Sequence, residues 1–166
     1  MGHYDFSRLR VLVCDDSRPM RTLVTMFLSG FGIKDPVQAS DAEDGFKKFL
    51  ELDLDLIITD WNMSPSSGLD MAEKIRTSKI SPNPYIPIIM LTGYTELYRV
   101  EQARDVGISG FIAKPVSADS LYRKLVAVVD DHRSFVSNDD YFGPDRRFRN
   151  LSLAGGSDRR TLELLH

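Results

Sequence analysis

The chain has 166 residues, of which 42% are hydrophobic and 27% are charged, and its formal net charge is -3 at pH 7. This composition is ordinary for a soluble globular protein, and the charge gives the molecule as a whole no attraction to nucleic acid or to membranes. No apolar stretch reaches the ~18 residues of a transmembrane helix, the first residues lack signal-peptide character, and the one cysteine, Cys14, excludes an internal disulfide. We therefore expect a cytoplasmic protein without membrane insertion.

Five short, largely apolar runs alternate along the chain with five stretches of helical periodicity. Such apolar runs predict buried parallel strands, here at residues 9–14, 36–39, 54–59, 86–91 and 110–113. Helices are expected at 18–30, after Asp41, after the serine-rich loop at 64–67, at 96–105, and from Ser117 or Ala118 to about Asp131. Ser17 is a suitable N-cap for the first helix, and Gly107 is expected to end the fourth.

The alternation of strands and helices predicts a doubly wound α/β domain built on a five-stranded parallel sheet. We expect this domain to occupy residues 1–132. Residues 133–166 differ in composition, since they contain six arginines and no lysine, and they are interpreted as an arginine-rich C-terminal extension.

Polar residues directly follow four of the predicted strands: Asp15-Asp16, Asp60, Thr92 and Lys114-Pro115. An open parallel sheet places its chemistry at the carboxyl ends of its strands, so these side chains should converge in one pocket. Three carboxylates repel one another unless a cation intervenes, and Mg²⁺ prefers such oxygen ligands. One carboxylate could then attack phosphorus, while Lys114, the Thr92 hydroxyl and the backbone beside Gly93 stabilise the phosphoryl oxygens.

Residues 9–131 resemble the receiver domain of two-component response regulators, close to the single-domain chemotaxis type represented by CheY. The residues that carry the resemblance are Asp15-Asp16, Asp60-Trp61-Asn62-Met63, Gly68-Leu69, Thr92-Gly93, Phe111 and Lys114-Pro115. The resemblance implies a flavodoxin-like receiver fold and a signalling switch, not a conventional enzyme. It also implies that Asp60 accepts a phosphoryl group from a histidine kinase or a phosphotransfer protein.

The same resemblance implies a metal site and a conformational switch. Mg²⁺ would be bound directly by Asp16 and Asp60, through water by Asp15, and by the backbone carbonyl of Asn62. Thr92 would shift toward the phosphoryl group, and Phe111 would change rotamer and remodel the neighbouring surface.

Three positions around the pocket modify this expectation. The family usually has proline directly after the methionine of the loop that follows the acceptor, where this chain has Ser64 and then Pro65. Phe111 replaces the tyrosine of many chemotaxis members, and the bulky Tyr94 is expected to slow loss of the phosphoryl group by shielding it from water.

The pocket has two other interpretations. A hydrolase that uses Asp60 as nucleophile usually has a second aspartate two residues later as general acid, and an amide, Asn62, stands there. An intact pocket that is no longer used, with another ligand in control, is the second alternative.

The extension contains a candidate nucleotide-binding set. Its members are Asp145, Arg146, Arg147, Arg149, Arg159 and Arg160, interspersed with Tyr141, Phe142 and Phe148. The planar guanidinium suits phosphates and the O6/N7 edge of guanine, an aspartate can accept from guanine N1 and N2, and aromatic rings can stack on a base. The extension is too short for a helix-turn-helix domain, so no DNA binding is expected.

An arginine-rich extension after a receiver also resembles the CheY-like cyclic di-GMP effectors of alphaproteobacteria. That resemblance implies that cyclic di-GMP orders the extension and promotes docking on a flagellar motor switch protein. The alternative is an ordinary phospho-acceptor receiver, acting as a phosphate shuttle or a kinase regulator, with an inert extension.

Overall fold

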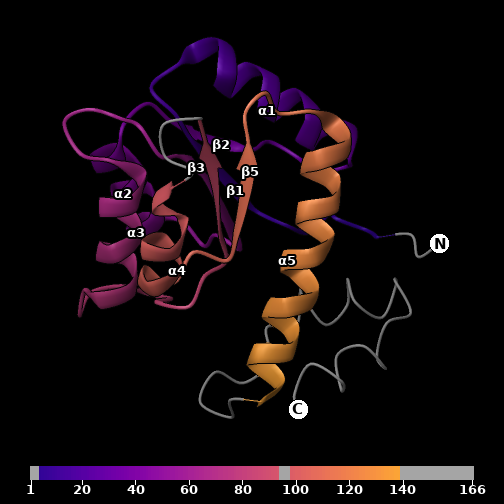
Figure 1. Cartoon of the computed structure of the whole chain (residues 1–166). Helices are drawn as coiled ribbons and strands as arrows, with labels where there is room; N and C mark the ends of the chain where they lie inside the picture. Colours follow the sequence, from indigo (N-terminus) through magenta and orange to yellow (C-terminus); the bar gives the residue numbers. More distant parts are fainter. Residues whose placement is uncertain (1–3, 94–97, 139–166) are drawn as a thin grey trace.

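The computed structural model describes residues 4–93 and 98–138, and for 132–138 the backbone alone. Five strands alternate with five helices over these residues (Figure 1). The strands are β1 (Val11–Cys14), β2 (Val37–Ala39), β3 (Leu56–Asp60), β4 (Ile88–Thr92) and β5 (Gly110–Ala113). The helices are α1 (Arg18–Gly30), α2 (Ala42–Glu51), α3 (Gly68–Thr77), α4 (Val100–Val106) and α5 (Ala118–Asn138).

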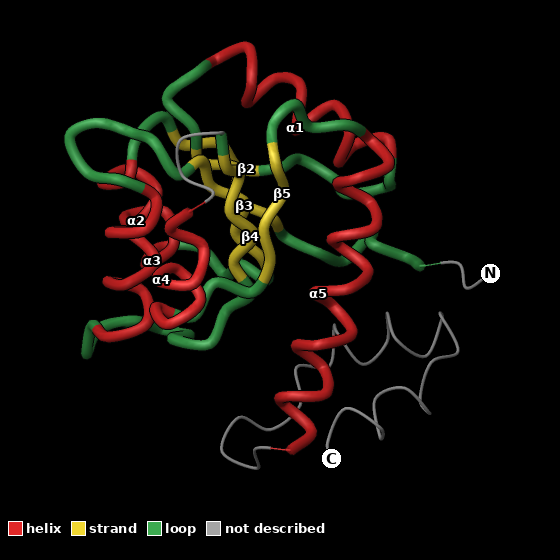
Figure 2. Tube along the Cα trace, viewed as in Figure 1, coloured by secondary structure: helices red, strands yellow, loops and turns green. Residues whose placement is uncertain are grey.

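The five strands form one parallel sheet in the order β2-β1-β3-β4-β5. Helices α1 and α5 cover one face of the sheet, and α2, α3 and α4 cover the other (Figure 2). The predicted doubly wound, flavodoxin-like architecture is therefore confirmed.

Each face of the sheet has its own hydrophobic core, because β1, β3 and β4 are buried throughout their length. On one face, Val24 and Leu28 of α1 belong to the same cluster as Leu125 of α5. On the other, Phe49 of α2 and Ile75 of α3 belong to the second cluster. Burial of each such side chain contributes about 1.5–3 kcal/mol to folding.

The register of the sheet aligns the carboxyl ends of four adjacent strands. The terminal pairs are Cys14 with Thr59, Asp60 with Leu91, and Thr92 with Ala113. The residues at and just after these pairs therefore line one edge of the sheet, as expected for the polar residues that end the strands.

Side-chain caps begin four of the helices, and at the start of α5 the Ser117 hydroxyl accepts from the Ser120 amide at 3.0 Å. Ser17 accepts a hydrogen bond from the Met20 amide, which confirms it as the N-cap of α1. Asp41 accepts from the Asp44 amide at the start of α2. Ser67 begins α3 through a reciprocal capping box with Asp70.

The last two helices differ from their predicted bounds. Helix α4 begins at Val100, so the predicted start at residue 96 is not part of the described helix, and residues 94–97 lie outside the described residues. It ends where predicted, because Gly107 takes a left-handed φ of 104°. Helix α5 continues to Asn138, seven residues beyond Asp131, since residues 132–138 contain no glycine or proline to end it.

The N-terminal segment packs against α5, which the sequence analysis did not anticipate. The Phe6 ring is almost fully buried and makes an edge contact with Tyr122. The Tyr4 ring stacks on Phe6, and its hydroxyl donates to the Asp130 carboxylate at 3.0–3.1 Å. These contacts attach the start of the described chain along α5, from Tyr122 in its amino half to Asp130 in its carboxyl half.

Candidate functional site

Three acidic side chains converge at the carboxyl edge of the sheet, where β1 and β3 end. Asp15, Asp16 and Asp60 each offer a carboxylate oxygen within 4.8 Å of the others. Asp15 and Asp60 are buried, whereas Asp16 is exposed. The register of the strands brings them together, as the sequence predicted from their positions at the strand ends.

Asp60 is paired with Lys114 across the sheet edge. The Lys114 ammonium lies 2.8 Å from Asp60 Oδ1. The backbone N–H of Lys114 donates to the Thr92 carbonyl at 2.8 Å. The Lys114-Pro115 peptide bond is cis, one of the two isomers allowed by the sequence. Burial raises the pKa of Asp60, although the Lys114 ammonium partly opposes this effect.

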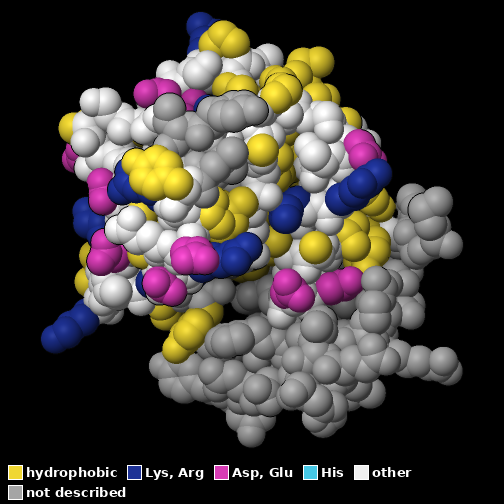
Figure 3. All heavy atoms as spheres, viewed as in Figure 1, with side chains coloured by type: hydrophobic (Ala, Val, Ile, Leu, Met, Phe, Trp, Pro, Cys, Tyr) yellow, Lys and Arg dark blue, Asp and Glu magenta, His cyan; other side chains and the backbone are white. Residues whose placement is uncertain are grey.

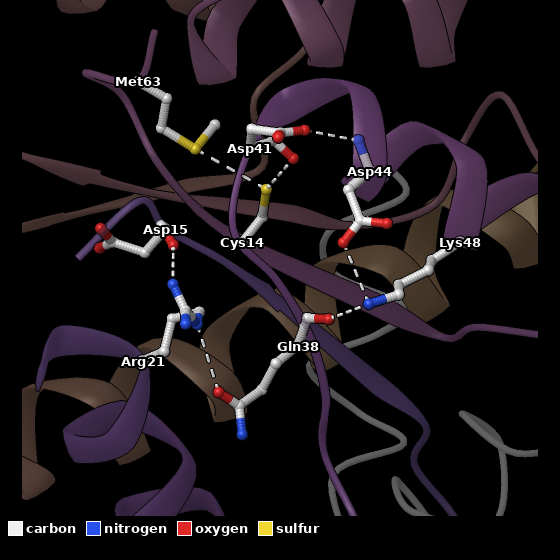
Figure 4. Close-up of polar contacts among 8 residues, drawn as sticks. All are labelled: Cys14, Asp15, Arg21, Gln38, Asp41, Asp44, Lys48 and Met63. Carbon is white, nitrogen blue, oxygen red and sulfur yellow. Dashed lines mark hydrogen bonds and ion pairs between the residues drawn. The ribbon is translucent and has the colours of Figure 1, made fainter. Parts of the chain in front are cut away.

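Asp15 has one carboxylate oxygen in use and one without a partner. Asp15 Oδ1 accepts a hydrogen bond from the Ser17 amide at 2.8 Å. The Arg21 guanidinium donates to the Asp15 backbone carbonyl at 2.7 Å and to the side-chain oxygen of Gln38 in β2 at 3.3 Å (Figure 4). Asp15 Oδ2 is buried and finds no hydrogen-bond donor among the described residues. Burial raises the pKa of Asp15 to about 6.

The three carboxylates of Asp15, Asp16 and Asp60 fit a hard divalent cation. A buried carboxylate oxygen without a donor is costly, and a cation between three carboxylates would remove both that cost and their mutual repulsion. Carboxylate oxygens are the ligands that Mg²⁺ prefers, and the exposed side of the cluster leaves room for its waters. Asn62 lies two residues after Asp60 in the same loop, where its backbone carbonyl is a candidate further ligand.

The loop after Asp60 is shaped by a close backbone approach at Gly68. A Cβ at residue 68 would overlap the Asp60 carbonyl oxygen and approach Thr59 Oγ1 to 2.9 Å. The Gly68 N–H donates to the Trp61 carbonyl at 2.9 Å, which closes the loop on itself. The Ser64-Pro65 bond within the loop is cis.

The two candidate switch residues, Thr92 and Phe111, line one hollow. This cavity of about 430 Å³ lies between α4, β5 and α5, and Arg104 and Lys124 also line it. Thr92 is buried, Gly93 follows it at the sheet edge, and Phe111 is half-buried. Figure 3 shows acidic and basic side chains interspersed over this face, so no field of a single sign covers it.

Sequence reasoning missed two arginines near the site. Arg21 holds the Asp15 backbone, and the Arg99 guanidinium lies over the Trp61 ring. Neither belongs to a motif with a characteristic spacing, so no local signal marked them. The predicted nucleotide-binding residues, Asp145, Arg146, Arg147, Arg149, Arg159 and Arg160, and the predicted shield Tyr94 lie outside the described residues.

A doubly wound domain with an acidic cluster at the carboxyl edge of this strand order is a receiver-type α/β domain. The sequence model of the response regulator receiver domain matches residues 11–125, and the chain belongs to this family. Receivers of the CheY type are signalling switches and not conventional enzymes. No helix among the described residues is long and apolar enough to cross a bilayer.

Several chemotaxis proteins are similar to this chain. Chemotaxis protein CheY1 of Helicobacter pylori is 34% identical over 122 residues, which cover 73% of this chain and 97% of that protein. Chemotaxis protein CheY-3 of Vibrio cholerae is 29% identical over 117 residues, covering 70% and 88%. The solved structure of CheY4 of Vibrio cholerae superposes with a TM-score of 0.66 at 28% identity, covering 72% of this chain and 98% of that one.

Proposed function

We propose that this protein is a cytoplasmic response regulator that carries a phosphoryl group on Asp60, accepted from a histidine kinase or a phosphotransfer protein. The observation that carries the proposal is the placement of the Asp60 carboxylate 2.8 Å from the Lys114 ammonium, beside a buried Asp15 oxygen that has no donor within the described part of the chain. The similarity to chemotaxis proteins of the CheY type supports it.

The reaction needs one nucleophile and several groups that bind oxygen. A carboxylate oxygen of Asp60 forms the new P–O bond while the P–N bond of a donor phosphohistidine breaks, and the donor imidazole keeps the electron pair. Lys114 can then move from the carboxylate to a phosphoryl oxygen, and the Thr92 hydroxyl and Gly93 N–H can donate to others. Bound Mg²⁺, held by Asp15, Asp16, Asp60 and the Asn62 carbonyl, would neutralise charge on the phosphoryl oxygens.

The output would use the face of α4, β5 and α5. Thr92 and Phe111 line the same cavity there, so a shift of the threonine toward the phosphoryl group would leave space into which the phenylalanine ring can turn. The altered face would then bind a partner, for which a flagellar motor switch protein is our candidate on the strength of the chemotaxis relatives.

Phosphorylation is tested with a small phosphodonor, acetyl phosphate, and intact-mass measurement of the full chain. We expect one added phosphate with Mg²⁺, none in the presence of a chelator, and none on Asp60→Asn. Asp105→Asn is the matched control, since it removes an exposed carboxylate on α4 and should leave the modification intact. Equal phosphate on Asp60→Asn and on the parent would contradict the assignment.

We further propose that the extension binds cyclic di-GMP through Arg146, Arg147 and Arg149, with Arg159 and Arg160 as second choices and Asp145 on the guanine edge. The support is the sequence alone: arginine without lysine, interspersed with aromatic residues. Calorimetric titration of cyclic di-GMP into the full chain should release heat that Arg146→Ala/Arg147→Ala abolishes. No heat with the parent would favour the alternative, a phospho-acceptor with an inert extension.

A further inference from the structure

Helix α4 is short, and its two ends are held by two arginines of very different environment. At its carboxyl end, the half-buried Arg76 of α3 donates twice to the Gly107 carbonyl, at 2.7 and 3.2 Å. The same guanidinium donates to the Pro84 carbonyl at 2.9 Å. Three hydrogen bonds from one half-buried guanidinium fix this end of α4 against α3.

At its amino end, α4 is preceded by the exposed Arg99, which makes no side-chain capping bond with the described residues. Its guanidinium carbon lies instead 5.7 Å from the centre of the Trp61 ring, within the range of a cation–π contact. Ala103 is the fully buried residue of α4, and Val100 at its first position is partly buried.

Trp61 connects this contact to the phosphorylation site. It directly follows Asp60 and is 2% exposed, and its backbone N–H donates to the Leu91 carbonyl at 3.1 Å. The Phe111 ring lies 6.4 Å from the Trp61 ring, centre to centre, at an interplanar angle of 33°. Arg99 therefore rests on the side chain of Trp61, which neighbours the candidate switch residue Phe111. The Trp61 backbone is joined directly to the candidate acceptor, Asp60.

We propose that Arg99 is a positioning residue: by resting on the Trp61 ring it holds the amino end of α4 in the arrangement of the unphosphorylated protein, and so lowers the affinity of the Asp60 site for a phosphoryl group. This proposal rests on the proposed function. The arrangement is the unphosphorylated one because Lys114 is paired directly with the Asp60 carboxylate.

Phe111 gives a route for the coupling between the acceptor site and Arg99. It lines the same cavity as Thr92 and Val100, and its ring is a neighbour of the Trp61 ring. A movement of Phe111 therefore changes the surroundings of the ring on which Arg99 rests. If phosphorylation breaks the Arg99 contact, linkage requires that removing the contact favours the phosphoryl group by the same factor, about two- to fivefold for an exposed cation–π pair.

The first measurement addresses the contact in the free protein. Trp61 is the only tryptophan of the chain, so fluorescence reports on it alone. Arg99→Gln should increase quenching of Trp61 by acrylamide, whereas Arg99→Lys, which keeps the cation, should stay near the parent. Arg123→Gln is the matched control, because Arg123 is exposed and pairs with Asp119 on α5. Equal quenching in Arg99→Gln and Arg123→Gln would show that Arg99 does not cover the ring.

The second measurement addresses the coupling, with beryllofluoride and Mg²⁺ as the probe of the acceptor site in the full chain. The half-saturating beryllofluoride concentration should fall about two- to fivefold in Arg99→Gln, less in Arg99→Lys, and not at all in Arg123→Gln. An unchanged or raised value in Arg99→Gln, with a normal response of the parent, would overturn the role of Arg99 alone. No response of the parent would contradict the proposed function, and with it the coupling.

Discussion

The close approach at Gly68 allows a quantitative test of how tightly the acceptor loop is built. In Gly68→Ala, the new methyl group would overlap the Asp60 carbonyl oxygen and lie 3.1 Å from the Asp60 carbonyl carbon. Both are backbone atoms of a buried central strand, so neither can rotate away. Overpacking against side chains costs about 1–3 kcal/mol, and we expect the upper end, about 3 kcal/mol, where backbone must move.

The same substitution elsewhere in the chain is the control. Gly30 is the last residue of α1, and a methyl group added there meets no atom within 4 Å. Because alanine has the higher helix propensity and restricts the unfolded chain, Gly30→Ala should stabilise the protein by a few tenths to about 1 kcal/mol. The two variants are therefore expected to differ in sign.

The assay is urea unfolding followed by circular dichroism. With a urea dependence of about 1–3 kcal/mol per molar, a loss of 3 kcal/mol lowers the midpoint by about 1–3 M, and the slope should be unchanged. A Gly68→Ala midpoint within experimental error of the parent, together with the expected rise in Gly30→Ala, would refute the steric reasoning.

Two further predictions concern buried polar groups. Tyr4→Phe removes the hydroxyl that donates to the buried Asp130 carboxylate and should lower the free energy of unfolding by about 1–2 kcal/mol. The control is Tyr98→Phe, at a residue that is 82% exposed, which should change the free energy of unfolding by less than about 0.5 kcal/mol. Equal effects of the two substitutions in urea unfolding would rule out the Tyr4 contact as a stabilising one. Burial raises the pKa of the Cys14 thiol from 9.0 to about 12, so the unfolded chain loses this proton first as pH rises. Stability should therefore fall more steeply above pH 9 in the parent than in Cys14→Ala, with a difference of up to about 1.4 kcal/mol per pH unit, and parallel pH profiles of the two proteins would contradict this.

The sheet edge was predictable because its signals are local. Each strand is a short apolar run that ends in a polar residue, and parallel pairing then places the ends together. The meeting of Asp60 with Lys114, 54 positions later in the chain, follows from that rule without any knowledge of side-chain contacts. Ser17 and Asp41 were likewise recognisable as helix starts from the cap chemistry alone.

Contacts between distant side chains had no such signal. Tyr4 and Asp130 are 126 positions apart, and nothing in either neighbourhood marks the other as a partner. Arg99 looks like any exposed arginine until the fold brings it over Trp61. The end of α5 was placed at Asp131 because the apolar periodicity stops near Val129, but a helix without a breaker continues beyond its buried face. The proposed domain boundary at residue 132 thus falls inside a helix.

The length of α5 sets the distance between the two proposed inputs. The helix begins four residues after Lys114, at the edge that carries Asp60, and its 21 residues span about 30 Å to Asn138 (Figure 1). Asn138, the last residue that the structure describes, therefore lies at the far end of α5 from the acceptor edge. One route between the two proposed inputs is α5 itself, acting as a lever that pivots on the Tyr4 and Phe6 contacts. A tryptophan signal that responds to cyclic di-GMP in the parent, but not after deletion of residues 1–6, would identify the lever.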